Sequence, residues 1–220
     1  MSAATATARR SYEQARADAE AFRDLFPPAC YRRWEVAGSV RRKAPSCGDV
    51  EHVVIPAFGE VDVGVGLFTT KQRMNLLWFH LDSLVRGDEP PLTKHIYGAT
   101  GYRWGEKHRG VDFRGFRHEF FCADEANWGA TLAIRTGPAE FSQRLVAGLL
   151  RNSRRNHLGR VWQCEPCPET LRMMDEGQCD KSCPRCQGTG LLPVTAIAVA
   201  EEREYIRLCG MGWVEPEARG

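Results

Sequence analysis

Apolar side chains recur along the chain at two different intervals, and each interval predicts a different kind of secondary structure. Residues 12–26 carry apolar or small side chains three or four positions apart, which is the spacing of one face of an α-helix. Ser11, with Gln14 three residues later, forms a capping-box pattern at the start of this helix. Residues 71–85 repeat the helical spacing, so we expect a second amphipathic helix there.

Shorter apolar segments, bounded by glycines and prolines, predict strands. Residues 31–36 and 51–55 flank a glycine-containing turn, and residues 59–66 predict a turn or a short hairpin. Further strands are expected at residues 102–107, 111–113 and 117–122. Two helices follow, one capped by Asp124 and one with Pro138 at its first position. This order of elements predicts an α+β fold, with a mixed sheet between flanking helices.

The composition is that of a globular protein and limits its partners. Hydrophobic residues make up 43% of the 220 residues and charged residues 26%, which allows a sizeable core. The formal net charge is only +2, so affinity for nucleic acid would come from local basic clusters at residues 32–43 and 151–160. No apolar run reaches the roughly 18 residues that cross a membrane, and residues 1–10 lack the apolar core of a leader.

Residues 38–51 hold the most distinctive chemistry in the chain. Asp49 and Glu51 are separated by one residue, and in an extended segment such side chains share a face about 7 Å apart. Two carboxylates on one face repel each other unless a cation lies between them, and hard oxygen ligands suit Mg²⁺. The alternative is a surface hairpin with an ordinary Asp and Glu.

The same segment begins with a small turn at Gly38 and Ser39. Its backbone N–H groups and the serine hydroxyl could bind phosphate, with a nearby arginine as the counter-charge. A phosphate-binding turn and a metal-binding pair would then lie within one short segment.

Glu119 is a candidate third carboxylate, because a two-metal phosphoryl-transfer site usually needs more than two. It stands within an aromatic and apolar strand, where an unpaired charge is costly. A metal shared with Asp49 and Glu51 would offset that cost. Pairing of Glu119 with Arg117 or Lys107 across a sheet is the alternative.

One set of residues stands in the order and spacing of a known family of enzymes. The set is Gly38, Ser39, Arg42, Gly48, Asp49, Glu51, Glu119, Thr136 and Gly137. It resembles the family X DNA polymerases, which belong to the polymerase-beta-like nucleotidyltransferase superfamily. The resemblance covers residues 31–150, and residues 201–219 look like the end of that family's thumb. Short stand-alone members from phages and bacteria are the most similar, which implies a cytoplasmic protein of a bacterial host or a phage.

The resemblance implies roles for the phosphate-binding and sugar-binding residues. Ser39 and Arg42 would hold the β- and γ-phosphates of a nucleoside triphosphate, and Gly48 would allow the backbone to approach closely. Thr136 and Gly137 would lie against the sugar and help to choose between deoxyribose and ribose.

The resemblance also implies a two-metal mechanism. Asp49 and Glu51 would bind two Mg²⁺ ions, for which Mn²⁺ could substitute, and Glu119 would complete the ion that activates a primer 3′-hydroxyl. Metals and arginine would neutralise charge on the α-phosphate and the leaving pyrophosphate. The expected enzyme is a monomeric DNA polymerase that extends a primer or a gapped duplex in DNA synthesis or repair.

Two other functions stay open. The small size of the chain motivates nucleotide transfer to RNA, a protein or a small molecule. Glu51 and Glu119, where the family more often has aspartate, motivate a non-catalytic nucleic-acid-binding protein with a zinc knuckle.

Cysteines near the C-terminal end predict a structural zinc site. Cys164 and Cys167, followed by Cys183 and Cys186, have the paired spacing of a tetrahedral zinc knuckle. Cys179 is a fifth candidate that could replace one of the four, and buried cysteines without a metal are the alternative.

Two domains are expected from these patterns. Residues 1–150 would form the N-terminal helix and the nucleotidyltransferase palm, and residues 151–220 a small zinc-binding, thumb-like subdomain. The histidines show no metal-ligand spacing, so the sequence assigns them no role.

Overall fold

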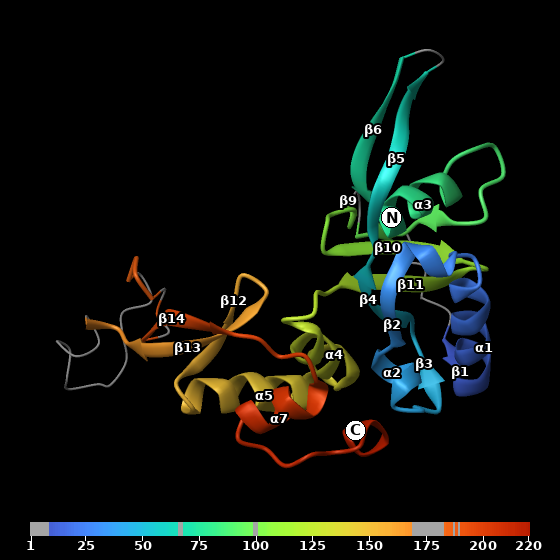
Figure 1. Cartoon of the computed structure of the whole chain (residues 1–220). Coiled ribbons are helices and arrows are strands. Elements are labelled where there is room, and N and C mark those ends of the chain that lie inside the picture. The colour runs from blue at the N-terminus through green and yellow to red at the C-terminus, as the bar shows by residue number, and fades with distance from the viewer. Residues whose placement is uncertain (1–8, 66–67, 99–100, 169–182, 187, 189) are drawn as a thin grey trace. The chain divides into compact units, whose positions relative to one another are not determined.

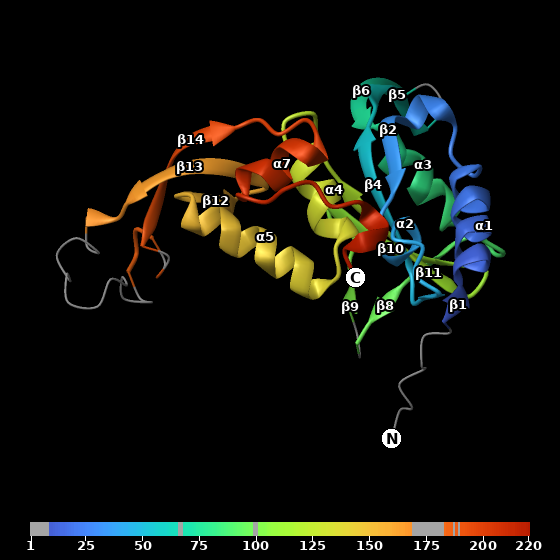
Figure 2. The same cartoon turned by 90° about the horizontal axis from the view of Figure 1, so that it is seen from below.

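The structure is a computed structural model, and it describes residues 9–65, 68–98, 101–168, 183–186, 188 and 190–220 (Figure 1, Figure 2). Contacts between residues divide the chain into two compact units. The first consists of Met1–Asp124, Arg135–Pro138 and Pro216–Gly220, and the second of Glu125–Ile134 and Ala139–Glu215. The sequence predicts a single boundary at residue 150. In the structure the first unit is instead made of three separate segments of the chain, the last of which is Pro216–Gly220.

A five-stranded mixed sheet forms the centre of the first unit. Its strands, in spatial order, are β2 (Tyr31–Val36), β4 (Val50–Pro56), β11 (Phe116–Cys122), β10 (His108–Phe113) and β7 (Thr93–Lys94). Strands β4 and β11 run parallel, whereas the other neighbouring strands are antiparallel. The predicted α+β class with a mixed sheet is therefore confirmed.

Helices α1 (Tyr12–Arg23) and α3 (Leu76–Leu84) pack against one face of this sheet. The predicted capping box of α1 is present, because the Gln14 N–H donates to Ser11 Oγ and the Ser11 N–H donates to the Gln14 side chain. The buried residues that join these helices to the sheet are Phe22, Phe26, Trp34, Val54, Leu77, Trp78, Leu81, Val111, Phe113 and Phe120. Polar residues of the same strands point to the opposite face.

The hairpin after β4 is longer than expected and shortens the helix that follows it. Strands β5 (Phe58–Val65) and β6 (Phe68–Asn75) pair along their whole lengths and project from the sheet (Figure 1). The helix predicted at residues 71–85 therefore begins only at Leu76, where the Asn75 side chain accepts a hydrogen bond from the helix backbone. Pairing with β5 satisfies the backbone groups before that point, so it overrides the helical spacing of the side chains.

Several short elements complete the first unit. They are β1 (Arg10–Ser11), η1 (Pro28–Cys30), α2 (Gly38–Arg41), β3 (Ser46–Cys47), β8 (Ile96–Tyr97), β9 (Gly101–Tyr102) and the C-terminal 3-10 helix η2 (Pro216–Ala218). The strand expected at residues 102–107 is wrong beyond Tyr102, because the chain turns there and a single bridge joins Trp104 to Arg109.

The second unit combines helices with a three-stranded antiparallel sheet. Its elements are α4 (Trp128–Thr136), α5 (Ala139–Arg151), β12 (Arg154–His157), β13 (Arg160–Pro166), β14 (Leu191–Ile197) and α7 (Glu202–Leu208); the last two residues of α4 count with the first unit. Gly148 allows close packing, because a Cβ there would lie 2.2 Å from the Cys209 carbonyl oxygen. In the part of the chain that the structure describes, no helix has the length and apolar character to span a membrane.

Candidate functional site

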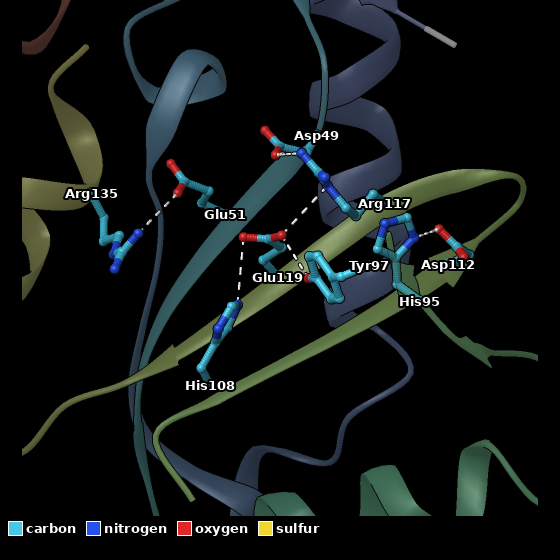
Figure 3. A network of polar contacts seen from close by, with 9 residues as sticks. All are labelled: Asp49, Glu51, His95, Tyr97, His108, Asp112, Arg117, Glu119 and Arg135. Carbon is cyan, nitrogen blue, oxygen red and sulfur yellow. Dashed lines mark hydrogen bonds and ion pairs between the residues drawn. The ribbon is translucent and has the colours of Figure 1, made fainter. Parts of the chain in front are cut away.

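Strand register brings the three predicted carboxylates to one face of the sheet. In the parallel pair of β4 and β11, Glu119 lies directly opposite Glu51, and Asp49 immediately precedes β4. Side chains alternate along a strand, so the following and preceding residues, His52 and His118, point instead to the face covered by α1. Figure 3 shows the three carboxylates close together on the other face.

Arg117 lies between two of these acids. Its Nη2 contacts Asp49 Oδ2, and its Nε lies 3.5 Å from Glu119 Oε1 (Figure 3). Tyr97 donates a hydrogen bond of 2.6 Å to the same Glu119 oxygen, and His108 Nε2 lies 3.5 Å from the other one. The pairing with Arg117 that the sequence left as an alternative is thus present, and it supplies part of the positive charge that a buried Glu119 requires.

The two neighbouring glutamates have opposite electrostatics. Burial raises the pKa of Glu51 to about 7, repulsion from Asp49 adds to this effect, and Arg135, 3.9 Å away, opposes it. Burial alone would also raise the pKa of Glu119, but His108, Tyr97 and Arg117 together lower it to about 2. Glu119 is therefore ionised at neutral pH. Glu51 is partly protonated there, and a cation bound beside it would favour its ionised form and so release that proton.

The carboxylates do not form a tight cage. Their oxygens do not all come within 4.8 Å of one another, a condition that only a group of cysteines meets among the described residues. The reason is visible in Figure 3, where Arg117 contacts Asp49 and Glu51 turns toward Arg135. Asp49, Glu51 and Glu119 offer the hard oxygen ligands that suit Mg²⁺, but in an open arrangement.

The Gly38–Ser39 turn packs directly on Glu51. Gly38 has φ +62°, which favours glycine, and a Cβ there would lie 2.4 Å from Glu51 Oε2, so a larger residue would also displace the Glu51 carboxylate. The Ala37 N–H donates a hydrogen bond of 2.8 Å to the Glu51 carbonyl, which holds the turn against β4. Ser39 Oγ is buried and has no hydrogen-bond partner within the described part of the chain. At Gly48 a Cβ would meet only Arg9 at 3.4 Å, so space alone does not require glycine there.

Two arginines join this turn to the other predicted nucleotide-binding residues. Arg42 donates a hydrogen bond of 2.6 Å to the Thr136 carbonyl, and Arg41 donates one of 2.8 Å to the Thr136 hydroxyl. Thr136 is fully buried at the end of α4, and Gly137 follows it. Arg42 and Thr136, which the sequence separates by 94 positions, are therefore in direct contact, as a shared binding site requires.

Sequence reasoning missed Tyr97, although its hydroxyl is the closest hydrogen-bond donor to Glu119. Tyr97 reaches the acid across Gly110, which is paired with Glu119 in the register of β10 and β11. A Cβ at Gly110 would lie 2.1 Å from the Tyr97 hydroxyl. A glycine inside a strand often marks such a close approach, so Gly110 was the available signal.

Two histidines without a predicted role form a buried pair beneath the carboxylates. The Trp34 indole donates a hydrogen bond of 3.1 Å to His52 Nδ1. His52 therefore carries its proton on Nε2, which donates a hydrogen bond of 3.0 Å to His118 Nδ1. Burial lowers the pKa of both rings, that of His118 to about 3, so both are neutral at physiological pH. The three residues link β2, β4 and β11 side by side.

In the second unit, three of the four predicted zinc ligands come together. The thiols of Cys167, Cys183 and Cys186 are buried and lie within 4.8 Å of one another, so they could hold a metal ion. Cys164 is not part of this group: its Sγ lies 3.5 Å from the Trp162 carbonyl, next to a register shift in β13. The role of Cys164 as a fourth ligand therefore stays a prediction, whereas the other three thiols lie together. Cys179 lies outside the described residues.

The structure thus gathers carboxylates and arginines in the first unit and thiols in the second. Asp49, Glu51 and Glu119 share one face, Gly38 packs against Glu51, and Arg42 contacts Thr136. Comparison with known proteins assigns no family to the chain, since no protein-family model matches it and no curated protein shows significant sequence similarity.

Proposed function

We propose that the first unit is a nucleotidyltransferase palm of the polymerase-beta-like kind, which adds nucleotides from a nucleoside triphosphate to a nucleic-acid 3′-hydroxyl and releases pyrophosphate. The observation that carries the proposal is the packing of the Gly38 turn on Glu51, while the parallel register sets Glu119 beside the same carboxylate. A phosphate-binding turn and an acid pair in contact are what transfer of a phosphoryl group from a triphosphate needs. We infer a DNA primer or gapped duplex as the acceptor, from the resemblance of the motifs to family X DNA polymerases.

The acidic residues fit divalent cations chemically. Asp49, Glu51 and Glu119 would hold two Mg²⁺ or Mn²⁺ ions, and the raised pKa of Glu51 shows that its buried charge lacks full compensation from the protein. When bound, such ions lower the pKa of an attacking hydroxyl and neutralise charge on the leaving phosphates. Arg117 contacts Asp49, and Tyr97 donates a hydrogen bond to one oxygen of Glu119, so both acids have partners that a bound cation would compete with or adjoin.

Ser39 and Arg42 would bind the phosphates beyond the reacting bond. The buried Ser39 hydroxyl supplies a hydrogen bond that no described residue satisfies, and Arg42 supplies positive charge a few residues away. Thr136 would border the sugar, since Arg41 and Arg42 hold both its hydroxyl and its carbonyl in place. These groups bind and orient the triphosphate, while the carboxylates hold the acceptor end of the site.

The thiols of the second unit would hold a structural zinc ion, because buried Cys167, Cys183 and Cys186 are the soft ligands that Zn²⁺ prefers. Removal of the metal with a chelator is expected to lower the melting temperature of the protein, with zinc measured in the released fraction. A melting curve that does not change, with no zinc released, would remove zinc from the proposal.

Labelled gapped, recessed and single-stranded primers, offered with each deoxynucleotide and ribonucleotide in Mg²⁺ or Mn²⁺, test the polymerase. Asp49→Asn is expected to abolish incorporation, whereas Glu60→Gln, which changes an exposed carboxylate on β5, retains it. Full activity of Asp49→Asn would contradict the proposal. Product analysis by mass spectrometry with RNA, protein and small-molecule acceptors shows whether the nucleotide goes elsewhere.

One observation favours a second candidate, a non-catalytic palm that binds nucleic acid. Arg117 already contacts Asp49 and lies 3.5 Å from Glu119, so an arginine supplies charge where an enzyme of this kind uses metal. Binding of labelled DNA without turnover on any acceptor, in Mg²⁺ and in Mn²⁺, would favour this candidate.

A further inference from the structure

A short hairpin of the first unit lies beside the candidate carboxylates. It consists of β8 and β9, and both of its ends bond to Gly110, the residue that pairs with Glu119 in the central sheet (Figure 2). The His95 N–H donates a hydrogen bond of 3.0 Å to the Gly110 carbonyl, and the Gly110 N–H donates one of 3.2 Å to the Arg103 carbonyl. Tyr97 extends from β8 to Glu119 (Figure 3). The hairpin is therefore fixed next to the site by its backbone as well as by one side chain.

The two faces of this hairpin carry different side chains. Tyr97 is opposite Gly101 in the register, and its ring lies on the face that turns toward Glu119. Ile96 is opposite Tyr102, and because side chains alternate along a strand, this pair lies on the other face. Ile96 is 55% and Tyr102 57% exposed, so an aliphatic side chain and an aromatic ring face solvent beside the carboxylates. In the part of the chain that the structure describes, the Tyr102 side chain takes part in no hydrogen bond or ring contact.

Two cations border this exposed pair. The Lys94 Nζ lies 4.5 Å from the centre of the Trp104 ring, and a hydrogen bond of 3.1 Å to Asp82 holds that ring in place. The Arg103 guanidinium lies 4.2 Å from the centre of the Tyr97 ring. Lys94 and Arg103 are both exposed, and neither forms an ion pair with a carboxylate within the described residues. Aromatic rings thus hold both charges at the border of the site without neutralising them.

The charge of the site itself explains what these cations can do. Four carboxylates lie on one face of the central sheet or just before it: Asp49, Glu51, Asp112 and Glu119. Together they repel a polyanion such as nucleic acid, which must nevertheless approach them if its 3′ end is to react. Positive charge at the border offsets this repulsion, and Lys94 and Arg103 supply it. The adjoining turn adds no net charge, since it holds one acid and one base, Glu106 and Lys107.

An exposed aromatic ring with cations beside it is suited to one state of nucleic acid. A base can stack on a tyrosine ring, while lysine and arginine bind the phosphates next to that base. Inside a duplex, neighbouring base pairs cover both faces of each base. Stacking on Tyr102 therefore requires a base outside the duplex stack, such as single strands, overhangs and gaps offer.

We propose that the β8–β9 hairpin binds an unpaired stretch of nucleic acid beside the carboxylates. Tyr102 and Ile96 pack against an unpaired base, and Lys94 and Arg103 bind the phosphates next to it. This inference rests on the proposed function and names residues that the motif pattern does not contain. The acceptor is then recognised by an unpaired base close to its reacting end as well as by the carboxylates and their ions.

Fluorescence anisotropy with the full-length protein and a labelled single-stranded oligodeoxynucleotide, without triphosphate, tests the inference. Tyr102→Ala is expected to weaken binding of the single strand by about 5- to 100-fold, the range for loss of one stacked base. Competition by a closed circular duplex, which has no unpaired end, should differ less than about twofold between the two proteins.

Further variants separate stacking from folding and from apolar contact. Tyr102→Phe keeps the ring and should bind as the wild type does, whereas Tyr102→Leu keeps apolar bulk without a ring and should lose affinity as Tyr102→Ala does. Phe79→Ala is the matched control, because it removes a ring that is 44% exposed on α3, and it should change binding less than about twofold. Equal affinity of the Phe and Leu variants would overturn the stacking role.

The salt dependence of binding tests the two cations. Lys94→Gln and Arg103→Gln should each reduce the slope of log affinity against log salt concentration by about 0.7, the contribution of one phosphate contact on a single strand. Arg73→Gln removes an exposed cation from β6 and should leave the slope unchanged. Slopes that are the same in all three variants would overturn the phosphate contacts.

Incorporation assays separate this inference from the function on which it rests. With a single-stranded acceptor, Tyr102→Ala should raise KM by the factor seen in binding and leave kcat within about twofold, because the ring binds the strand without taking part in the chemistry. Incorporation by the wild type, with binding and KM unchanged in Tyr102→Ala, would overturn the role of the hairpin and leave the nucleotidyltransferase standing.

Two other outcomes are equally decisive. Ring-dependent binding of single strands, without incorporation on any acceptor, would overturn the transfer reaction and leave the hairpin as a surface that binds single strands. A change in the sedimentation of Tyr102→Ala, with binding of single strands intact, would show that the exposed pair joins two copies of the chain and would overturn the inference.

Discussion

The two faces of the central sheet are built from the same strands, but their buried polar side chains are compensated differently. On the face covered by α1, His52 and His118 are neutral and linked by hydrogen bonds to Trp34. On the other face, one position along each strand, Glu51 and Glu119 are charged groups whose pKa values are displaced in opposite directions. On the histidine side, both nitrogens of His52 and Nδ1 of His118 are hydrogen-bonded, and only His118 Nε2 has no partner among the described residues. The other face carries charges that favour binding of ions or ligands.

The comparison predicts that the two faces separate stability from function. Substitutions on the face of His52 and His118, the histidine face, should lower the free energy of unfolding. Substitutions on the face of Glu51 and Glu119, the acidic face, should lower activity at little or no cost in stability. Buried polar networks stabilise a fold only when their members are satisfied, while functional sites retain unsatisfied charge.

The largest effect is expected for Glu51→Gln on the acidic face. Incorporation should fall by about three orders of magnitude or more, because a neutral amide cannot serve as an ionised metal ligand. The free energy of unfolding at pH 8 should rise by about 1–3 kcal/mol, because the variant removes a buried charge that Asp49 repels. Single-turnover incorporation and urea unfolding measure both, and a variant that is both active and less stable would refute the assignment.

The next effect lies on the histidine face. His118→Leu leaves the buried His52 Nε2–H without its acceptor, so the free energy of unfolding should fall by about 1–3 kcal/mol. His108→Leu is the matched control on the acidic face: incorporation should fall because Glu119 loses a partner, while stability changes little. Urea unfolding and incorporation by both variants test the contrast, which fails if the two variants behave alike.

The histidine face should also contribute to the pH dependence of stability. In the folded chain burial holds the pKa of His52 and His118 below 6.5, whereas in the unfolded chain both rings titrate near that value. Below pH 6.5 the unfolded state therefore binds more protons, and stability is lost as pH falls toward about 3. Each histidine should contribute up to about 1.4 kcal/mol per pH unit, while Glu51, whose pKa is raised to about 7, acts in the opposite direction over part of this range, so the difference between the wild type and His118→Asn gives the contribution of His118. Urea unfolding between pH 7.5 and pH 5 measures it, and His118→Asn, which keeps an acceptor but does not titrate, should show a shallower slope.

The smallest effect is expected for Tyr97→Phe. Loss of the hydroxyl removes the 2.6 Å hydrogen bond to Glu119 and leaves the ring in place. A single hydrogen bond of this kind contributes about 1 kcal/mol, so incorporation should fall about fivefold. Incorporation rates at saturating triphosphate measure the change, and a loss as large as that of Glu51→Gln would show that Tyr97 does more than orient Glu119.

Local sequence patterns were sufficient for the features that depend on neighbours in the chain. The Ser11–Gln14 capping box, the strand after Asp49 and the α+β class were all predicted correctly, because caps and periodicity involve contacts within a few residues. The same reasoning failed at residues 71–75, where pairing with a distant strand outweighed helical spacing. The paired cysteine spacing correctly brought Cys167, Cys183 and Cys186 into one candidate metal site, and the role of Cys164 stays a prediction.

Contacts between distant segments decided the composition of the candidate site. Spacing makes Glu119 a candidate, but only the parallel register of β4 and β11 sets it opposite Glu51. Tyr97 reaches Glu119 because Gly110 leaves the space, and Arg42 meets Thr136 across 94 positions of sequence. The sequence specifies which charged side chains are present. Which of them lie next to one another depends on which strands become neighbours, because burial of the whole core determines the strand order.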